Sequence, residues 1–415
     1  MVRRILWYLF VMTFVAGCAG VVPEELVPAP AATDPAIKHT ASCKHEEHLS
    51  SAEQKAPAAV YVQEGELFGI DLEARTTRKL LGKQDATDFS TESATFSGNG
   101  ELLVIHRDKE GRDSWWAASA DGSDLKRLPL PVDRQVRHVV RLCQTEFVAV
   151  LEDGRFARFS TQGDPVYWEP GHEDQPMPDT SVVGSPGSGA IAFPSRTGVI
   201  VLVPNEKSLA VASRVRGSEI HGWAGDDRLV TGDRDAIYVT EIPSGVSRSV
   251  ELRSVFGSGS GLITVSVHPR DKLLYVARRS SIPGGPKSIV ALDLTTLQPL
   301  EALPNRIPPE SNGAPSFSPL GSYEVWPVEE PKDLPYASGV AIVNAQTGEV
   351  LHVTDADMIS VPYALHPKDL GFVFSDLSRE GTVLVYQDAA GRRFDLTQSS
   401  TGAPIRAFEW NPSQG

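Results

Sequence analysis

A histidine-rich segment near the start of the chain holds its densest set of potential metal ligands. His39, Cys43, His45 and His48 lie within ten residues, together with two glutamates. Thiolate, imidazole and carboxylate groups bind borderline divalent ions such as zinc and copper. The spacing matches no standard zinc pattern, so a solvated polar linker is the favoured interpretation. We therefore predict no metal centre and no cofactor, and keep metal capture as a secondary hypothesis.

Two histidine–proline pairs suggest catalysis at first sight. His268 and His366 each precede a proline at the end of a strand-like run. Their equivalent positions favour a structural role in a turn, because proline fixes the backbone there and ends the strand.

Motifs that would position a nucleophile or a phosphate are missing from the sequence. There is no Gly-x-Ser-x-Gly elbow and no Asp-x-Asp-x-Asp-Gly calcium loop, and the glycine-rich stretch 257–261 lacks the lysine of a phosphate loop. We predict no catalytic residue. An envelope hydrolase or lactonase built from dispersed loop residues stays open as an alternative.

The N-terminus carries a secretory signal. Arg3 and Arg4 precede an apolar run over residues 5–15, which is too short to span a bilayer. The following Val-Ala-Gly-Cys, ending at Cys18, resembles the lipobox of bacterial lipoproteins. The resemblance implies removal of residues 1–17, acylation of Cys18, and, because residue 19 is alanine, anchoring in the outer membrane.

Residues 18–57 form the predicted tether between the lipid and the folded domain. Their Pro, Ala and Glu bias is typical of extended linkers. The two other cysteines are Cys43 in this tether and Cys143 in the domain. An oxidising envelope permits a disulfide between them, but two unpaired thiols are equally compatible with the sequence.

Composition limits the possible partners. The chain has 415 residues with a formal charge of −14, which argues against binding to nucleic acid or broadly to an anionic membrane surface. Its 35 glycines and 31 prolines suit a turn-rich all-β fold.

Residues 58–415 predict a single all-β domain made of repeats. Short apolar runs alternate with turns at a period of roughly 40–50 residues, which is typical of a β-propeller. No convincing helix is visible. Each unit begins with a strand that ends in a small or proline-containing turn, as in residues 94–100, 181–187, 263–269, 315–321 and 361–367, and less clearly in 136–143 and 219–225.

The turn motifs of these units, Phe-Ser-Pro-x-Gly and Val-x-Val-His-Pro, resemble the blades of TolB-like and YVTN-type propellers. The resemblance is loose but covers most of residues 58–412 and implies four-stranded blades. Eight blades, this length and a lipid anchor are also similar to the BamB family of outer-membrane assembly lipoproteins. The motifs differ from that family, so no residue role is carried over.

The last strand-like stretch, residues 404–412, has no strands after it, whereas the first strands, from Val60, lack such a beginning. We predict that the two pair and close the ring, which leaves no long sheet edge open. Both ways of counting strands then give eight blades. Seven is the alternative, if one of the two unclear units is misassigned.

Trp115 and Trp116 are adjacent in a predicted strand, so their rings point to opposite faces of the blade. Both faces of a propeller blade are covered, so we expect both rings to lie in the core.

Loop lengths predict which face of the propeller binds. Loops between the first and second and the third and fourth strands of a blade lie on one face, and here they are short. The other face receives every long insertion: 107–114, 171–180, 278–287, 304–313, 329–338 and 375–381. Function concentrates in loops held by a rigid scaffold. Candidate binding residues there are Arg278, Arg279, Arg306, Glu329, Glu330, Asp333, Tyr336 and His172.

Together these features predict a monomeric, lipid-anchored envelope propeller that binds another envelope protein without catalysis. The alternatives are the hydrolase, with its site in the central channel, and a sensor that uses the channel or the histidine-rich tether. The sequence favours neither the periplasmic side nor the cell surface.

Overall fold

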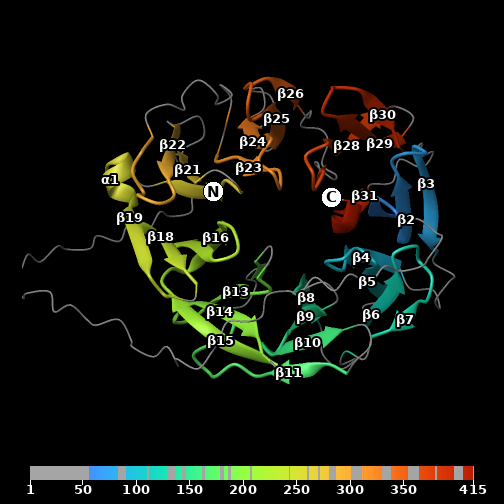
Figure 1. Cartoon of the computed structure of the whole chain (residues 1–415), viewed down its shortest axis with the longest axis horizontal. Helices are drawn as coiled ribbons and strands as arrows, with labels where there is room; N and C mark the ends of the chain where they lie inside the picture. The colour runs from blue at the N-terminus through green and yellow to red at the C-terminus, as the bar shows by residue number, and fades with distance from the viewer. Residues whose placement is uncertain are drawn as a thin grey trace, which may run out of the picture. The chain divides into compact units, whose positions relative to one another are not determined.

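Strands of this chain pair almost entirely with their neighbours in sequence, which produces a row of small antiparallel sheets. The structure, a computed structural model, describes residues 56–414 except 83–89, 110–111, 129, 131–135, 143–145, 161–163, 178–181, 186–187, 206–207, 243, 259–260, 270–271, 280–286, 301–310, 312, 330–337, 354–363, 379–380 and 397–404. The sheets are the eight blades of a β-propeller arranged around a central axis (Figure 1). The predicted fold class and blade number are confirmed.

Each blade is ordered from an inner strand beside the axis to an outer strand at the rim. Blades one to four are: β31 (Ile405–Trp410), β1 (Ala59–Gln63), β2 (Glu66–Asp71), β3 (Thr76–Leu81); β4 (Ser90–Phe96), β5 (Leu102–Lys109), β6 (Arg112–Ser119), β7 (Lys126–Arg127); β8 (Val136–Arg141), β9 (Glu146–Leu151), β10 (Phe156–Ser160), β11 (Val166–Trp168); β12 (Val183–Gly184), β13 (Ile191–Ser195), β14 (Gly198–Pro204), β15 (Leu209–Val215).

Blades five to eight follow in the same order: β16 (Glu219–Trp223), β17 (Arg228–Gly232), β18 (Ala236–Glu241), β19 (Ser247–Glu251); β20 (Leu262–Val267), β21 (Leu273–Arg279), β22 (Lys287–Asp293); β23 (Ser316–Phe317), β24 (Tyr323–Glu329), β25 (Ser338–Asn344), β26 (Val350–Val353); β27 (Ala364–Leu365), β28 (Gly371–Ser378), β29 (Gly381–Asp388), β30 (Arg393–Asp395). Within the described residues blade six has three strands, and a single bridge between Leu292 and Pro299 stands at its outer edge.

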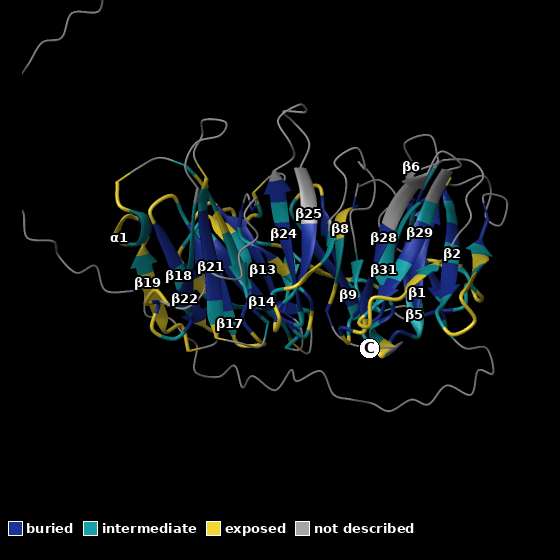
Figure 2. Ribbon diagram, turned by 90° about the horizontal axis from the view of Figure 1, so that it is seen from above, coloured by how far each residue is buried: buried dark blue, intermediate teal, exposed yellow. Residues whose placement is uncertain are grey.

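The hydrophobic core is divided among the interfaces between blades. Successive strand residues point to opposite faces, so each blade contributes one set of side chains to each neighbour. Eight buried clusters result, one for each pair of adjacent blades. Trp115 packs toward blade three and Trp116 toward blade one, as expected for two core rings. Figure 2 shows the consequence: buried strand centres between exposed turns.

The predicted closure is confirmed. β31 pairs antiparallel with β1, from Ala59 opposite Trp410 to Gln63 opposite Ile405. The last strand of the chain therefore becomes the inner strand of the first blade (Figure 1, red beside blue). Asn411, which is fully buried, donates from Nδ2 to the carbonyl oxygens of Pro57 and Gly100 at 3.1 Å each, and so ties the closing strand to blades one and two.

Two expectations about connections were wrong. Residues 107–114 and 375–381 are not loops, because β5 and β6 pair as far as Lys109 and Arg112, and β28 and β29 as far as Ser378 and Gly381. A short helix, α1 (Leu252–Phe256), also lies in the crossover between blades five and six. Its five residues are too few to show helical periodicity in the sequence, and only Leu252 is buried.

Candidate functional site

The face that carries the short turns is occupied by contacts between blades, and we call it the tight-turn face. Both histidine–proline turns belong to these contacts. His268 of blade six packs edge-on against Phe317 and lies over Gly321 of blade seven. His366 of blade eight packs against Trp410 of blade one, with ring centroids 4.8 Å apart. The turn interpretation of both histidines is confirmed.

The turn of blade eight also holds blade seven. The buried Asp369 carboxylate accepts hydrogen bonds from the Ser318 hydroxyl at 2.8 Å and from the Leu320 and Ser322 N–H groups at 3.2 and 2.7 Å. Ser318 is the serine of the Phe-Ser-Pro motif, so this motif makes the contact between blades.

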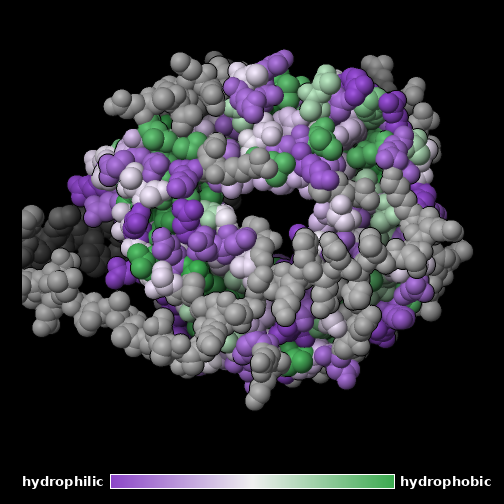
Figure 3. Space-filling model, viewed as in Figure 1, coloured by the Kyte–Doolittle hydropathy of each residue, from purple (hydrophilic) through white to green (hydrophobic). Residues whose placement is uncertain are grey.

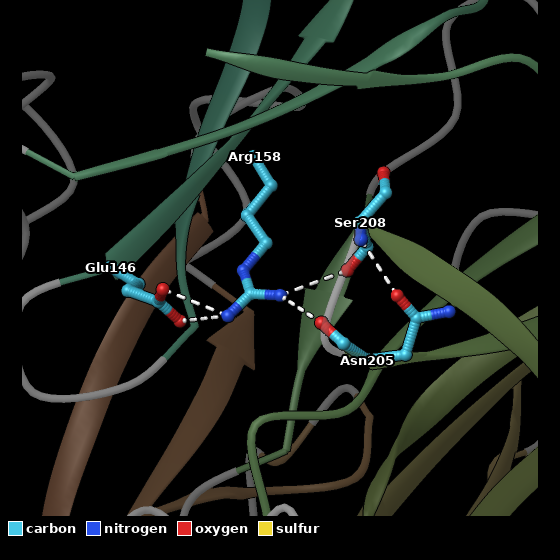
Figure 4. A network of polar contacts seen from close by, with 4 residues as sticks. All are labelled: Glu146, Arg158, Asn205 and Ser208. Atoms are coloured by element: carbon cyan, nitrogen blue, oxygen red, sulfur yellow. Dashed lines mark hydrogen bonds and ion pairs between the residues drawn. The ribbon is translucent and has the colours of Figure 1, made fainter. Parts of the chain in front are cut away.

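Blades three and four are joined by one arginine (Figure 4). Arg158 Nη2 lies 2.8 Å from both carboxylate oxygens of Glu146, and its Nη1 donates to the carbonyl oxygens of Asn205 and Ser208 at 2.6 and 2.9 Å. The planar guanidinium satisfies a carboxylate and two carbonyls at once, which a lysine could not do. These four residues are therefore engaged in the contact between blades three and four.

The opposite, long-loop face bears the described candidates from the sequence. Arg278 and Arg279 end β21, and the backbone of Glu329 ends β24. His172 is exposed in the crossover from blade three to blade four. They share a face, but the two arginines, Glu329 and His172 lie in different parts of the ring, so they do not form one cluster. Arg306, Glu330, Asp333 and Tyr336 lie outside the described residues, as do Cys18, Cys43, Cys143 and the histidine-rich segment.

The crossover that carries His172 is fixed to the rim of blade four. Asp174, two residues further on, forms an ion pair with Arg214 of β15, with Oδ2 and Nη2 2.7 Å apart. Pro176 forms a bridge with Ser195 of the same blade. His172 therefore sits away from the axis.

A patch with interface character lies at the long-loop end of blade six. Leu262, the first residue of β20, is 62% exposed and pairs across the strand with the exposed Arg279. The Arg278 guanidinium lies 5.1 Å from the ring centre of Phe256 in α1, within range of a cation–π contact. We call Leu262, Phe256, Arg278 and Arg279 the blade-six patch. Leu262 and Arg279 are exposed, whereas Phe256 and Arg278 are half-buried. Arginine and aromatic groups are enriched at protein interfaces.

Charged side chains also lie on the inner strands, which the sequence did not single out. Arg137, His138 and Arg141 of β8 and Glu219 of β16 are exposed, although these strands are the innermost of their blades. The space-filling view shows an opening at the centre of the domain (Figure 3). The only signal in the sequence that could have identified them is the presence of charged residues in the first strand of a repeat, where apolar core residues are expected.

Glu409 of the closing strand is the most perturbed acid on this inner wall. Burial raises its pKa to about 7, against the opposing effects of the Arg141 charge and of hydrogen bonds from the Phe96 N–H and the Thr95 hydroxyl. The carboxyl is therefore partly protonated near neutral pH.

His221 is the corresponding perturbed base. It lies at a bulge in β16, and its ring covers Gly232 so closely that a Cβ there would meet Nε2 at 2.4 Å. Burial lowers the pKa of His221 to about 4, so the imidazole is neutral at physiological pH.

Neither a metal cluster nor a spanning helix is present in the part of the chain that the structure describes. No three His, Cys, Asp or Glu side chains there lie close enough to share an ion. The helices among those residues are all too short or too polar to cross a bilayer.

Comparisons with known proteins identify the fold class alone. No protein-family model matches the sequence, and no curated protein matches it. Among solved structures, dihydro-heme d1 dehydrogenase NirN is similar, with a TM-score of 0.57 and 14% identity over 88% of this chain and 77% of NirN. Prolyl oligopeptidase B from Galerina marginata gives a TM-score of 0.52 and 9% identity over 76% of this chain and 50% of its own.

The Dos1 propeller is a third similar structure, with a TM-score of 0.50 and 9% identity over 78% of this chain and 87% of its own. At these identities only the architecture is shared. The chain is an eight-bladed β-propeller. Its likeness to TolB-like, YVTN-type and BamB proteins in particular stays a prediction.

Proposed function

We propose that this protein is a lipid-anchored propeller of the bacterial cell envelope that binds another envelope protein through its long-loop face, without catalysis. The observation that carries the proposal is the difference between the two faces. The turns of the tight-turn face that hold His268, His366 and Asp369 are engaged in contacts between blades, whereas the long-loop face carries Leu262, which is exposed, in the blade-six patch.

The blade-six patch supplies suitable binding chemistry. Leu262 offers apolar area that is exposed in the free protein. Arg279 stands beside it, and Arg278 lies over Phe256 on the other side of the blade. Arginine and aromatic anchors contribute a large share of binding energy at protein interfaces.

The location rests on the sequence. An apolar run followed by Val-Ala-Gly-Cys18 supports export and acylation, and several acyl chains hold a protein on a membrane where one does not. Outer-membrane rather than inner-membrane anchoring is part of the proposal and rests on Ala19.

Cross-linking in native membranes followed by mass spectrometry tests the proposal. The full-length protein is expected to fractionate with outer membranes, to carry acyl chains on residue 18, and to cross-link to one main partner through the blade-six patch. Cys18→Ala should release it from the membrane. Leu262→Asp should reduce cross-linking by about tenfold, the loss expected when an interface anchor is removed.

Leu370→Asp is the matched control. Leu370 is 52% exposed but lies in the first turn of blade eight, on the tight-turn face, so the same change there should leave cross-linking intact. Equal effects of the two substitutions, or the absence of any specific partner, would contradict binding through the long-loop face.

A further inference from the structure

The inner strand of blade three presents an exposed arginine at its end. Arg141 ends β8 and is exposed although β8 is the innermost strand of its sheet. None of the described residues forms a hydrogen bond or an ion pair with its guanidinium within the usual distance limits, whereas Arg158 of the same blade is fully engaged. Its side chain is exposed to solvent.

Cross-strand pairing fixes the direction of this side chain. Directly opposed residues of paired strands lie on the same face of a sheet. Arg141 is opposite Phe147, whose ring belongs to the core between blades two and three. Arg141 therefore points toward blade two.

Glu409 approaches blade two from the other side. It is opposite Val60, which belongs to the core between blades one and two. Its Oε1 accepts from the Phe96 N–H of β4 at 3.3 Å, and the Thr95 hydroxyl donates to the same carboxyl. The end of the inner strand β4 thus lies beside both groups, and the Arg141 charge reaches the Glu409 carboxyl.

Strand direction places the three groups at one end of the channel. All inner strands run the same way, because each begins at a crossover on the long-loop face and ends at a first turn. Phe96 and Arg141 are the last residues of their strands, and Glu409 is the next to last. The site therefore opens toward the tight-turn face, opposite the blade-six patch.

We propose that this end of the channel is a binding site for a small oxyanion, a carboxylate or sulfate-like group of a soluble molecule, with Arg141 as its anchor and Glu409 as a proton-controlled gate. A guanidinium binds such groups through paired charge-assisted hydrogen bonds. Ionised Glu409 competes with the ligand for Arg141 and repels the negatively charged ligand. Protonated Glu409 does neither. This function goes beyond partner binding and does not depend on it.

The sign of the pH dependence follows from the groups around Glu409. The groups beside Glu409 are Thr95 and Phe96 of β4, Arg141 of β8 and Val60 of β1. Glu92 lies near the other end of β4. His366 of blade eight contacts Trp410, on the opposite side of β31. Burial favours the neutral carboxyl, so the gate opens as the pH falls through about 7. Anion binding is expected to strengthen in the same direction.

Isothermal titration of the full-length protein in detergent tests the proposal, with sulfate and malonate at pH 5.5 and 8. Sulfate keeps its charge over this interval, so its affinity reports the protein alone. Wild type should bind about tenfold more tightly at pH 5.5, a typical size for coupling between two sites. Glu409→Gln should bind at pH 8 about as tightly as wild type does at pH 5.5. Arg141→Gln should lose at least about tenfold in affinity.

Arg127→Gln on β7 and Glu251→Gln on β19 remove the same charges from outer strands and should leave binding unchanged. Thermal melts of all variants separate loss of binding from loss of folding. Absence of sulfate binding at pH 5.5 would overturn the proposal. So would an Arg141→Gln protein that is folded and binds normally, or a Glu409→Gln protein that binds no more tightly than wild type at pH 8.

Discussion

At the scale of single residues, Glu409 shows how the closing strand introduces an ionisable group where a core side chain would be expected. Its neighbours are Val60 across the strand and the Phe96 N–H and Thr95 hydroxyl of β4, and burial raises the pKa of the carboxyl to about 7. An unfolded glutamate has an ordinary pKa of 4.5. The folded protein therefore binds this proton more tightly than the unfolded chain does.

Stability should fall with rising pH because of this one group. Below pH 4.5 the carboxyl is protonated in both the folded and the unfolded state, so it does not change the free energy of unfolding. Between pH 4.5 and about 7 it lowers the free energy of unfolding increasingly, and above about 7 the loss is constant. Between pH 5 and 8 the wild-type protein should therefore lose about 1–3 kcal/mol more unfolding free energy than Glu409→Gln does, since each pKa unit corresponds to about 1.4 kcal/mol. Urea unfolding at both pH values measures it, and equal pH slopes for the two proteins would contradict it.

At the scale of elements, the first turn of each repeat does two tasks. It reverses the chain between the inner and second strands, and it supplies side chains that hold an adjacent blade. Asp369 is the clearest case, because its backbone has a positive φ of 54° and its carboxylate accepts three hydrogen bonds from blade seven. The unusual backbone favours aspartate or asparagine over other residues with a side chain.

Asp369→Ala should cost about 2–4 kcal/mol of unfolding free energy, because buried donors on Ser318, Leu320 and Ser322 lose their acceptor. Asp369→Asn is the matched variant: it tolerates the same backbone and keeps one acceptor oxygen, so it should cost clearly less. A double-mutant cycle with Ser318→Ala should give a coupling of about 1 kcal/mol. Additive effects would show that the two side chains do not act together.

At the scale of the whole molecule, the propeller is closed by segments from the two ends of the chain. β31 pairs with β1 along its length, Ile405 is buried, and Asn411 reaches carbonyls of blades one and two. Gly100 must remain glycine for this contact, because a Cβ there would meet Asn411 Oδ1 at 1.9 Å. β31 contributes to the cores on both sides of blade one, so loss of this strand alters both.

Deletion of residues 404–415 should therefore destabilise the entire domain by about 5 kcal/mol or more, a loss at the extreme of single-site effects. Deletion of residues 414–415 alone keeps β31 and Asn411 and should melt like the intact protein. Circular dichroism melts compare the two. A 404–415 deletion that unfolds at the temperature of the intact chain would refute a closing role for β31.

Local pattern in the sequence was sufficient for the architecture. Alternating strands, turn residues at a regular spacing and an unmatched strand at each end predicted eight blades and the pairing of 405–410 with the strand at Val60. These features depend on neighbours along the chain, where period and turn chemistry act directly. They also predicted that His268 and His366 belong to turns and that Trp115 and Trp116 are core residues.

Long-range proximity was decided only by the tertiary structure. Glu409 and Arg141 are far apart in the sequence, and no pattern around either residue indicates that both lie beside β4. Closure of the ring brings them there, and burial between blades then changes the acidity of Glu409. The sequence by itself determined the repeat and its closure. The chemistry of the channel depends on which blades become neighbours. Glu409 and Arg141 are separated by some 270 residues, and their proximity leaves no local pattern in the sequence.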